Sequence, residues 1–429
     1  MRGAVTPRLT ELPGFRLKGM RTHSTPAVRQ KCVPRTLSCP TRSFRALFVQ
    51  YDAQVGGSPI SGAMVVGALV DAGWQIDAVF ASDGPMIRRY EELGCRAHVL
   101  AHGQWLRGGS AWRRARRWGR ELGATGRFVR LMRRLKPDLV YVNTITGLAA
   151  VTAARLLRVP SVWHIRELFD DVGGEMHAPL GGKALARWAV ARLPSRVVVI
   201  SEAVAENVLG GRQSPQVAVI PNAVGPRFFE EQRSAAECRA MFGLPTGVPL
   251  IGVPGTLRPV KGHEFFFAAA RRVGETSPEC RFAVTGAGPA DYRARLEAQA
   301  TEAGLCDRTY FLGPVADMPA FYRACDVICV PSRSEPFGRT VIEAFAVGTP
   351  VVATAVGGMR ETIKHEKTGL LVDYGDAEGL SAALLRVLAD RALACRPASA
   401  GRDHALECYR EELYQDRIGR LVEGPVGQK

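Results

Sequence analysis

Two acidic residues frame the segment SRSEPFGRTVIEAFAVGTPVVAT, residues 332–354, and pose the first chemical question of this chain. Glu335 follows an apolar run and precedes a Pro-Phe-Gly turn, whereas Glu343 lies about one turn inside a predicted apolar helix. The start of a helix offers unpaired amides and the positive end of a dipole, so it favours an anion. A carboxylate beside it can accept hydrogen bonds from a polyol. The spacing therefore suits a ligand that carries both phosphate and sugar.

A purely structural interpretation of both acids stays open. Thr340 and Glu343 match the Ser/Thr-x-x-Glu capping box, in which the glutamate returns to the amide of the capping residue. Glu335 would then be an ordinary exposed acid in a loop. Its position at the end of a predicted strand favours the functional interpretation, because ligands of open α/β sheets bind at the carboxyl ends of strands.

The elements around these acids predict an α/β protein. From residue 44, β-rich runs alternate with helix-length segments, which predicts parallel strands with helical crossovers. The predicted strands form two series, RALFVQY, WQIDAVFA, CRAHVL, DLVYVN, PSVWHI, RVVVIS and QVAVIPN, then PLIGVPG, CRFAVTGAG, TYFLG, DVICVPS, TPVVAT and GLLV. We therefore predict two Rossmann-like, doubly wound domains, residues 44–224 and 225–401, that face a central cleft.

Glycine-rich turns follow three of the predicted strands. They read QVGGSPISG, GTLRPVKG and TGAGPA. Glycine allows close approach of the backbone to phosphate, although turn glycines are also common without a ligand. GAGPA lacks the third glycine of the dinucleotide fingerprint and does not follow the first strand of its series. A nicotinamide-dependent dehydrogenase is therefore disfavoured.

Length and composition are those of a two-domain globular protein. The chain has 429 residues, of which 46% are hydrophobic and 23% charged, and this length exceeds one ordinary core. Its ten cysteines lack zinc or redox spacing, which predicts reduced thiols in a cytoplasmic protein. No uninterrupted apolar run approaches the ~20 residues of a transmembrane helix.

The net charge of +16 comes from two segments. Residues 1–43 hold nine Lys/Arg and one acid, and residues 101–136 hold eleven and one acid, so the remainder is nearly neutral. The first segment lacks hydrophobic periodicity and an apolar run suited to a signal peptide. We interpret residues 1–43 as a basic, disordered extension; a transit peptide or a mis-assigned start codon are the alternatives.

The segment EPFGRTVIEAFAVGTPVVAT resembles the two-glutamate signature of retaining, nucleotide-sugar-dependent glycosyltransferases of family 4, where two glutamates flank seven residues. Further stretches match in the family's order: GGSPISG, WHIRE, VIPNAV, GTLRPVKG, FLGPVADMPAFYRACDVICVPS, GGMRE and KTGLLV. The similarity covers roughly residues 44–420. It implies the GT-B fold, with a C-terminal helix at about residues 402–422 that crosses back to the first domain.

The resemblance also implies roles for individual residues. Arg258 and Lys261 would hold the donor diphosphate and stabilise the charge of the leaving nucleotide. Glu335 would bind the transferred sugar. The remaining donor contacts would come from Gly57 on the first domain, Val315 near the nucleobase, backbone groups of Phe337 and Gly338, the amides of Thr340 and Val341, and Glu343 at the ribose.

His164 in WHIRE has two interpretations. A histidine at the end of a strand is by default a packed residue, but the matching family residue lies over the reaction centre and contacts the donor sugar. Many relatives place Asp after this histidine, whereas here Ile165 and Arg166 come before Glu167. Arg166 would bind an acidic or phosphorylated acceptor, or pair with Glu167 or Asp170.

The resemblance implies a reaction that needs no protein nucleophile, because the leaving phosphate assists the incoming hydroxyl on the same face. We expect no cofactor and no metal, since Asp170 and Asp171 are adjacent and read as a solvated loop rather than a metal-binding pair. Closure of the domains over the donor would exclude water.

Residues 105–136 combine arginines with aromatic and large apolar side chains, and should form one or two helices. Three interpretations compete: a helix on an anionic membrane surface, a contact with an acidic acceptor such as a lipid-linked diphosphate, and a solvated face whose apolar residues pack inward. Nucleic-acid binding is not expected, because no recognised motif accompanies the charge.

We therefore predict a hexosyltransferase that moves a sugar from a UDP-, GDP- or ADP-sugar to a glycan or lipid-linked acceptor in cell-surface glycoconjugate synthesis. We expect it in the cytoplasm or peripherally on the inner face of the cytoplasmic membrane. The alternatives are a sugar-nucleotide epimerase of the same fold and a catalytically silent nucleotide-sugar-binding protein.

Overall fold

A computed structural model describes residues 44–426 apart from 104, 107–108, 170–175, 178, 180–181 and 212–215. Its first half contains a seven-stranded parallel sheet of order β3-β2-β1-β4-β5-β6-β7. The strands are β1 (Arg45–Gln50), β2 (Gln75–Phe80), β3 (Arg96–Val99), β4 (Leu139–Val142), β5 (Ser161–Ile165), β6 (Arg196–Val199) and β7 (Val217–Val219). The central strand β4 reads LVYV and is wholly buried, as expected for a parallel strand covered on both faces.

The second half repeats this architecture with a six-stranded parallel sheet of order β10-β9-β8-β11-β12-β13. The strands are β8 (Leu250–Pro254), β9 (Arg281–Thr285), β10 (Thr309–Gly313), β11 (Val327–Val330), β12 (Val351–Thr354) and β13 (Leu370–Val372). The prediction of two Rossmann-like, doubly wound sheets is confirmed.

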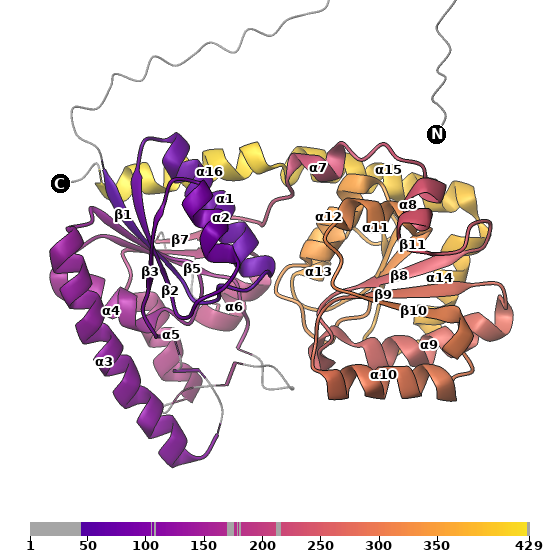
Figure 1. Cartoon of the computed structure of the whole chain (residues 1–429), viewed down its shortest axis with the longest axis horizontal. Coiled ribbons are helices and arrows are strands. Elements are labelled where there is room, and N and C mark those ends of the chain that lie inside the picture. The colour runs from indigo at the N-terminus through magenta and orange to yellow at the C-terminus, as the bar shows by residue number, and fades with distance from the viewer. Residues whose placement is uncertain are drawn as a thin grey trace, which may run out of the picture. The chain divides into compact units, whose positions relative to one another are not determined.

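Helices connect successive strands in both halves (Figure 1). The first half has α1 (Gly57–Asp71), α2 (Met86–Glu92), α3 (Ala111–Leu135), α4 (Leu148–Leu157), α5 (Gly182–Arg192) and α6 (Glu202–Leu209). The second has α7 (Pro226–Phe229), α8 (Ala235–Met241), η1 (Pro259–Lys261), α9 (His263–Thr276), α10 (Ala290–Glu302), η2 (Cys306–Arg308), α11 (Met318–Ala324), α12 (Arg339–Val347), α13 (Met359–Thr362) and α14 (Ala377–Ala389). None of the helices within the described ranges is long and apolar enough to span a bilayer.

The C-terminal segment differs from the expected single helix over about residues 402–422. It forms α15 (Arg391–Cys408) and α16 (Glu411–Val426), which are separated at Tyr409 and Arg410. Helix α15 packs on α12 of the second half, whereas α16 packs along α1 of the first half (Figure 1). At the break, the carbonyl of Tyr409 accepts a hydrogen bond from the amide of Val224 at 2.8 Å. The chain therefore passes between the halves at two adjacent points, and the helix breaks where it passes.

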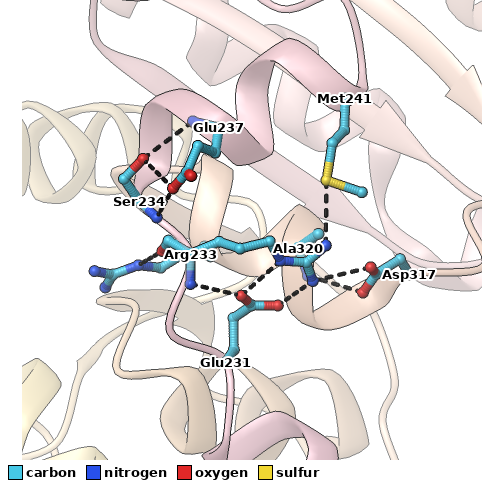
Figure 2. Close-up of polar contacts among 8 residues, drawn as sticks. Glu231, Arg233, Ser234, Glu237, Met241, Asp317 and Ala320 are labelled. Carbon is cyan, nitrogen blue, oxygen red and sulfur yellow. Dashed lines mark hydrogen bonds and ion pairs between the residues drawn. The ribbon is translucent and has the colours of Figure 1, made fainter. Parts of the chain in front are cut away.

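The segment after Val224 is anchored to the second half by charged groups (Figure 2). Arg233 pairs with Glu231 and with Asp317, the latter through Nη2 at 2.9 Å from Oδ2. The hydrogen bonds from Arg233 hold the pKa of Glu231 below its ordinary value. Asp317 also caps α11 by accepting from the amide of Ala320. This network ties the start of the second half to α11, the helix that leads into β11.

Candidate active site

The candidate site lies where the strand order of the second sheet reverses. Strands β8 and β11 are neighbours in the sheet although two strands come between them in sequence. Such a switch point leaves room for a ligand beyond the carboxyl ends of the two strands. The turn after β8 carries Arg258 and Lys261, and the loop after β11 carries Glu335. The topology alone therefore brings these three predicted residues to one place.

Lys261 and Glu335 form an ion pair at this point. The Nζ atom of Lys261 lies 2.7 Å from Oε2 of Glu335, and the two side chains are 27% and 10% exposed. Gly262 makes the pair sterically possible, because a Cβ at this residue would lie 1.9 Å from the carbonyl oxygen of Pro331. Its φ of 71° is also in the left-handed region that favours glycine. The glycine of the VKG turn thus allows the lysine turn to approach the glutamate loop.

Two adjacent glycines, Gly357 and Gly358, pack against the backbone of the Glu335 loop. The amide of Gly358 donates to the carbonyl of Glu335 at 3.0 Å, and a Cβ at Gly357 would lie 2.2 Å from that same carbonyl. The amide of Gly338 donates to Oε1 of Glu335 at 3.3 Å. Glu335 is therefore a buried carboxylate in a constrained loop, with one oxygen bonded to a lysine and the other to an amide.

Glu343 does not close a capping box with Thr340, and that interpretation is wrong. Helix α12 begins at Arg339 with Gly338 as its N-cap, and no side chain caps it. Glu343 instead accepts hydrogen bonds from the hydroxyl of Tyr322 at 2.9 Å and from Nε of Arg339 at 2.7 Å. The box fails because the turn at Gly338, with φ 96°, starts the helix one residue before Thr340. Glu343 is thus a buried acceptor with one donor on each carboxylate oxygen.

The amino end of α12 supplies part of the expected anion site. No acidic side chain lies in its first turn, and the carboxylate that meets its start, Glu335, comes from the preceding loop and accepts from the amide of Gly338. The amide of Val341 donates to the carbonyl of Gly338 at 3.0 Å, which counts against its expected role at a phosphate. Similarly, the carbonyl of Phe337 accepts from the hydroxyl of Thr362. A phosphate contact from Thr340 stays a prediction.

The first half reaches this site through the amino end of α1. Gly57 is the first residue of α1, and that helix too has no side-chain cap and no acid in its first turn. Arg339 donates through Nη1 to the carbonyl of Gly57 at 3.1 Å and to the hydroxyl of Ser61 at 3.0 Å. The structure therefore brings Gly57 beside the start of α12, although 282 residues separate it from Arg339.

Two further predicted donor residues, Arg258 and Val315, follow strands β8 and β10 of the second sheet. Arg258 is the extended residue that precedes η1. Val315 follows β10, two strands away from β8, and is partly buried against the main apolar core. Its placement near a nucleobase stays a prediction.

His164 lies inside the first half with no exposed surface. Its Nδ1 lies 2.7 Å from the hydroxyl of Tyr141 and 3.3 Å from Nη2 of Arg166. Because a guanidinium can only donate, Nδ1 is the acceptor and the proton is on Nε2, which has no hydrogen-bond partner among the described residues. Burial, followed by the nearby Arg166 charge, holds the pKa of His164 well below its ordinary value. The imidazole is therefore neutral, and a contact with the donor sugar stays a prediction.

Arg166 is the centre of a buried polar network that sequence reasoning did not find. Its guanidinium donates to Asn143 Oδ1 at 2.9 Å, to Asn222 Oδ1 at 2.5 Å and to the hydroxyl of Tyr414 at 2.8 Å. Glu167 does not pair with this guanidinium by a hydrogen bond. Its carboxylate accepts from the amides of Ile145 and Arg166, and burial raises its pKa. Asp170, the other expected partner of Arg166, lies outside the described residues.

Comparisons with known proteins decide the family. Residues 235–404 match the family model described as glycosyl transferases group 1, and residues 56–223 match a glycosyl transferase 4-like domain. A 2-deoxystreptamine glucosyltransferase from Streptomyces kanamyceticus is 33% identical over 293 residues, which is 64% of this chain and 74% of the relative. The chain belongs to this family of glycosyltransferases.

The glycosyltransferase has other relatives of diverse description. A D-inositol 3-phosphate glycosyltransferase of Stackebrandtia nassauensis is 30% identical, covering 75% of this chain and 67% of the relative. A lipopolysaccharide core biosynthesis mannosyltransferase of Rhizobium leguminosarum is 30% identical, covering 63% and 75%. These names support an enzyme of the hexosyltransferase class.

Solved structures confirm the GT-B fold of the glycosyltransferase. Anabaena HepE, crystallised with UDP and glucose, superposes with a TM-score of 0.75 at 23% identity, covering 89% of this chain and 99% of HepE. A sucrose-phosphate synthase from Thermosynechococcus elongatus has a TM-score of 0.73 at 23% identity, covering 90% and 100%.

The expected independence from metal stays a prediction for this glycosyltransferase. No group of three or more His, Cys, Asp or Glu side chains in the described ranges is arranged to hold an ion. Asp170 and Asp171 lie outside those ranges. The residues that sequence reasoning missed are Tyr322 and Arg339 at Glu343, and the partners of Arg166. Only the i, i+4 spacing of Arg339 and Glu343 offered a signal for one of these contacts.

Proposed function

We propose that this glycosyltransferase moves a hexose, with retention of configuration, from a UDP-, GDP- or ADP-sugar to a glycan or lipid-linked acceptor. The observation that carries this proposal is the Lys261–Glu335 pair, 2.7 Å apart, at the switch point beside two uncapped helix starts. Cations and amides suit a diphosphate, and the adjacent buried carboxylate suits the hydroxyls of a sugar.

Two observations support a nucleoside diphosphate sugar as the donor. Glu343 accepts one hydrogen bond on each carboxylate oxygen, from Arg339 and from Tyr322. Each oxygen has a further lone pair, so the carboxylate can still accept the hydroxyls of a ribose. HepE, which shares the fold, was solved with UDP and glucose. A nucleoside diphosphate sugar satisfies the ribose, phosphate and sugar contacts with one molecule.

The proposed reaction exchanges one bond at the anomeric carbon. The bond from C1 to the diphosphate oxygen breaks, the acceptor oxygen forms a new bond to C1 on the same face, and the acceptor proton passes to the leaving phosphate. Arg258 and Lys261 stabilise the charge that develops on the leaving diphosphate. Glu335 orients the sugar. No protein nucleophile is required, and neutral His164 would serve only as a contact to the sugar.

The acceptor is proposed to be polyhydroxylated. The relatives are named for 2-deoxystreptamine, for inositol 3-phosphate and for the lipopolysaccharide core, and all three are molecules with several hydroxyl groups. The buried guanidinium of Arg166 already donates to four neutral acceptors, which argues against this residue as the site of an acceptor phosphate.

Helix α3 is proposed to contact an anionic membrane surface and keep the enzyme at the inner face of the cytoplasmic membrane. Most of its large apolar residues pack inward: Phe128, Leu131 and Met132 are buried. Trp112 and Leu122, however, are each 69% exposed among arginines, and an exposed tryptophan on a basic helix suits a membrane interface. Co-sedimentation with phosphatidylglycerol vesicles, absent with phosphatidylcholine and reduced by Trp112→Ala, is the expected result. Equal sedimentation of the variant contradicts the proposal.

A thermal-shift screen with UDP-, GDP- and ADP-sugars tests the donor assignment. One base should raise the melting temperature, and its sugar nucleotide should bind more tightly than the bare nucleotide. Glu335→Ala should remove that preference for the sugar, since it deletes the carboxylate assigned to it. A preference that survives in the variant contradicts the role of Glu335. A released epimer in an assay without acceptor would favour the epimerase alternative.

A further inference from the structure

Arg339 lies between the two helix starts that frame the candidate site. It is the first residue of α12, and its guanidinium bridges Glu343 on its own helix and the Gly57–Ser61 turn of α1. Nε and Nη1 make these contacts, whereas Nη2 makes no hydrogen bond to any residue in the described ranges. The side chain is 16% exposed. Two nitrogens of the guanidinium, Nε and Nη1, are therefore held by protein groups, and Nη2 can donate to a ligand.

The electrostatics of this position call for an anion. A guanidinium at the start of a helix opposes the dipole, and here it lies beside two such starts. Neither α1 nor α12 has an acid in its first turn. Glu343 is the carboxylate that pairs with Arg339, with Nε 2.7 Å from Oε1.

The sum of the charges at the site also favours an anionic ligand. Lys261 is paired with Glu335, and Arg339 is paired with Glu343. Without Arg339, the cations Arg258 and Lys261 would be matched by two carboxylates, and a diphosphate of about two negative charges would meet a site of no net charge. Arg339 makes the site cationic before the donor arrives.

We propose that Arg339 is a third cation for the donor diphosphate, which binds through Nη2 while Glu343 and the Gly57–Ser61 turn hold the guanidinium in place. This inference rests on the proposed function and adds to it a residue that determines specificity. Because the contact is to the diphosphate, Arg339 should favour nucleoside diphosphates over monophosphates. It would also link the ribose-binding carboxylate to the first half's glycine turn through one side chain.

Calorimetric titration with a diphosphate and its monophosphate, using the base that the wild type prefers, tests this directly in the full chain. Arg339→Leu should weaken binding of the diphosphate by about ten- to hundredfold, as expected for the loss of a charge-assisted hydrogen bond. Binding of the monophosphate should change much less, so the ratio of the two affinities falls. Arg339→Lys should recover part of the ratio, since it keeps the charge and loses the fork.

Arg271→Leu is the matched control. Arg271 makes the same Nε contact to a glutamate four residues on, Glu275, at 3.2 Å on the outer surface of α9. This variant should leave both affinities unchanged. Circular dichroism and melting temperature verify folding of each variant, and Arg339→Gln replaces Arg339→Leu should the leucine variant not fold.

Two results would overturn the inference. An equal loss of affinity for both nucleotides would show that Arg339 only fastens α1 to α12, and unchanged affinities would show that it has no role in donor binding. A wild-type protein that binds no nucleoside diphosphate at all would contradict the proposed function itself. That outcome is visible before any variant is measured, so the two failures are distinguishable.

Discussion

The two halves of this glycosyltransferase place polar residues at the same edge of the same kind of sheet, yet the two groups differ in character. In the first half, Arg166 is surrounded by neutral amide and hydroxyl partners and is 6% exposed. In the second half, Lys261 and Arg339 face carboxylates and retain exposed surface. The hydrogen-bonding groups of Arg166 are used by neutral partners within the protein. The charges in the second half form two ion pairs, Lys261–Glu335 and Arg339–Glu343.

This difference distinguishes polar groups that are already satisfied within the protein from polar groups that could still bind a ligand. A buried cation that already has four acceptors gains little from a ligand, and its removal leaves those acceptors unsatisfied. Paired charges beside uncapped helix starts can exchange a protein partner for a substrate group of the same chemistry. Polar residues at a strand end are therefore informative about function only when their hydrogen-bonding capacity is not already used.

The largest expected effect is on the stability of the first half. Arg166→Met leaves Asn143 and Asn222 without a donor in the interior, and should lower the free energy of unfolding by about 3 kcal/mol. Urea denaturation measures it, with Arg271→Met as the surface control. The affinity of the folded variant for a nucleotide should not change. A stable variant that loses only acceptor turnover would instead place Arg166 in the acceptor site.

Next in size is the loss of donor binding in the second half. Lys261→Ala should weaken binding of the sugar nucleotide by about a hundredfold, or about 2.7 kcal/mol, because a charge-assisted contact to the diphosphate is lost. The free energy of unfolding should fall by only about 1 kcal/mol. Titration calorimetry and urea denaturation separate the two quantities. Undiminished donor binding would contradict the assignment of Lys261 to the donor diphosphate. The proposed difference in ligand binding between the two halves would then lack support.

Acid should destabilise both halves through buried histidines, which include His102 and the fully buried His164 in the first half and His263 in the second. Burial lowers the pKa of His102 in the first half and of His263 in the second to about 4, from 6.5. Between these values the unfolded chain binds more protons, so stability is full above pH 6.5 and falls as the pH drops towards 4. The expected loss is roughly 1 kcal/mol per histidine between pH 6.5 and 5.5.

Single histidine variants show how much of this acid effect comes from each half of the chain. His102→Asn and His263→Asn should each flatten the dependence of unfolding free energy on pH, measured by urea titration at several pH values. Equal flattening is expected because the two pKa values are alike. A profile that neither variant alters would mean that other groups cause the acid sensitivity.

The smallest effect concerns the orientation of Glu343. Tyr322→Phe removes the hydrogen bond from the tyrosine hydroxyl to Oε2, 2.9 Å away, and should weaken nucleotide binding about fivefold, or about 1 kcal/mol. The free energy of unfolding should change less, since the ring stays packed. The measurement is calorimetric, with the bare nucleoside as a second ligand. Stronger nucleotide binding in the variant would show that Tyr322 competes with the ribose.

Much of the fold could be predicted because it depends on local patterns. The apolar runs and the glycine turns between them predict parallel strands, and the order of strand and helix predicts two Rossmann-like sheets. The approach of Lys261 to Glu335 could be anticipated because both follow strands at one sheet edge. The break between α15 and α16, and the helix start at Gly338 rather than Thr340, depend on backbone turns that residue preferences do not specify.

By itself, the sequence determined the family, the parallel sheets and the residues that carry charge at the second sheet's edge. Only the tertiary structure decided which of those charges pair, because the partners come from distant segments: Tyr322 with Glu343, Arg339 with Gly57, Arg166 with Tyr414. Hydrogen bonding depends on distances of about 3 Å, and chain positions hundreds of residues apart acquire such distances only when the sheets and helices have packed. The same packing made His164 a buried neutral acceptor and left Nη2 of Arg339 without a hydrogen bond to the part of the chain that the structure describes.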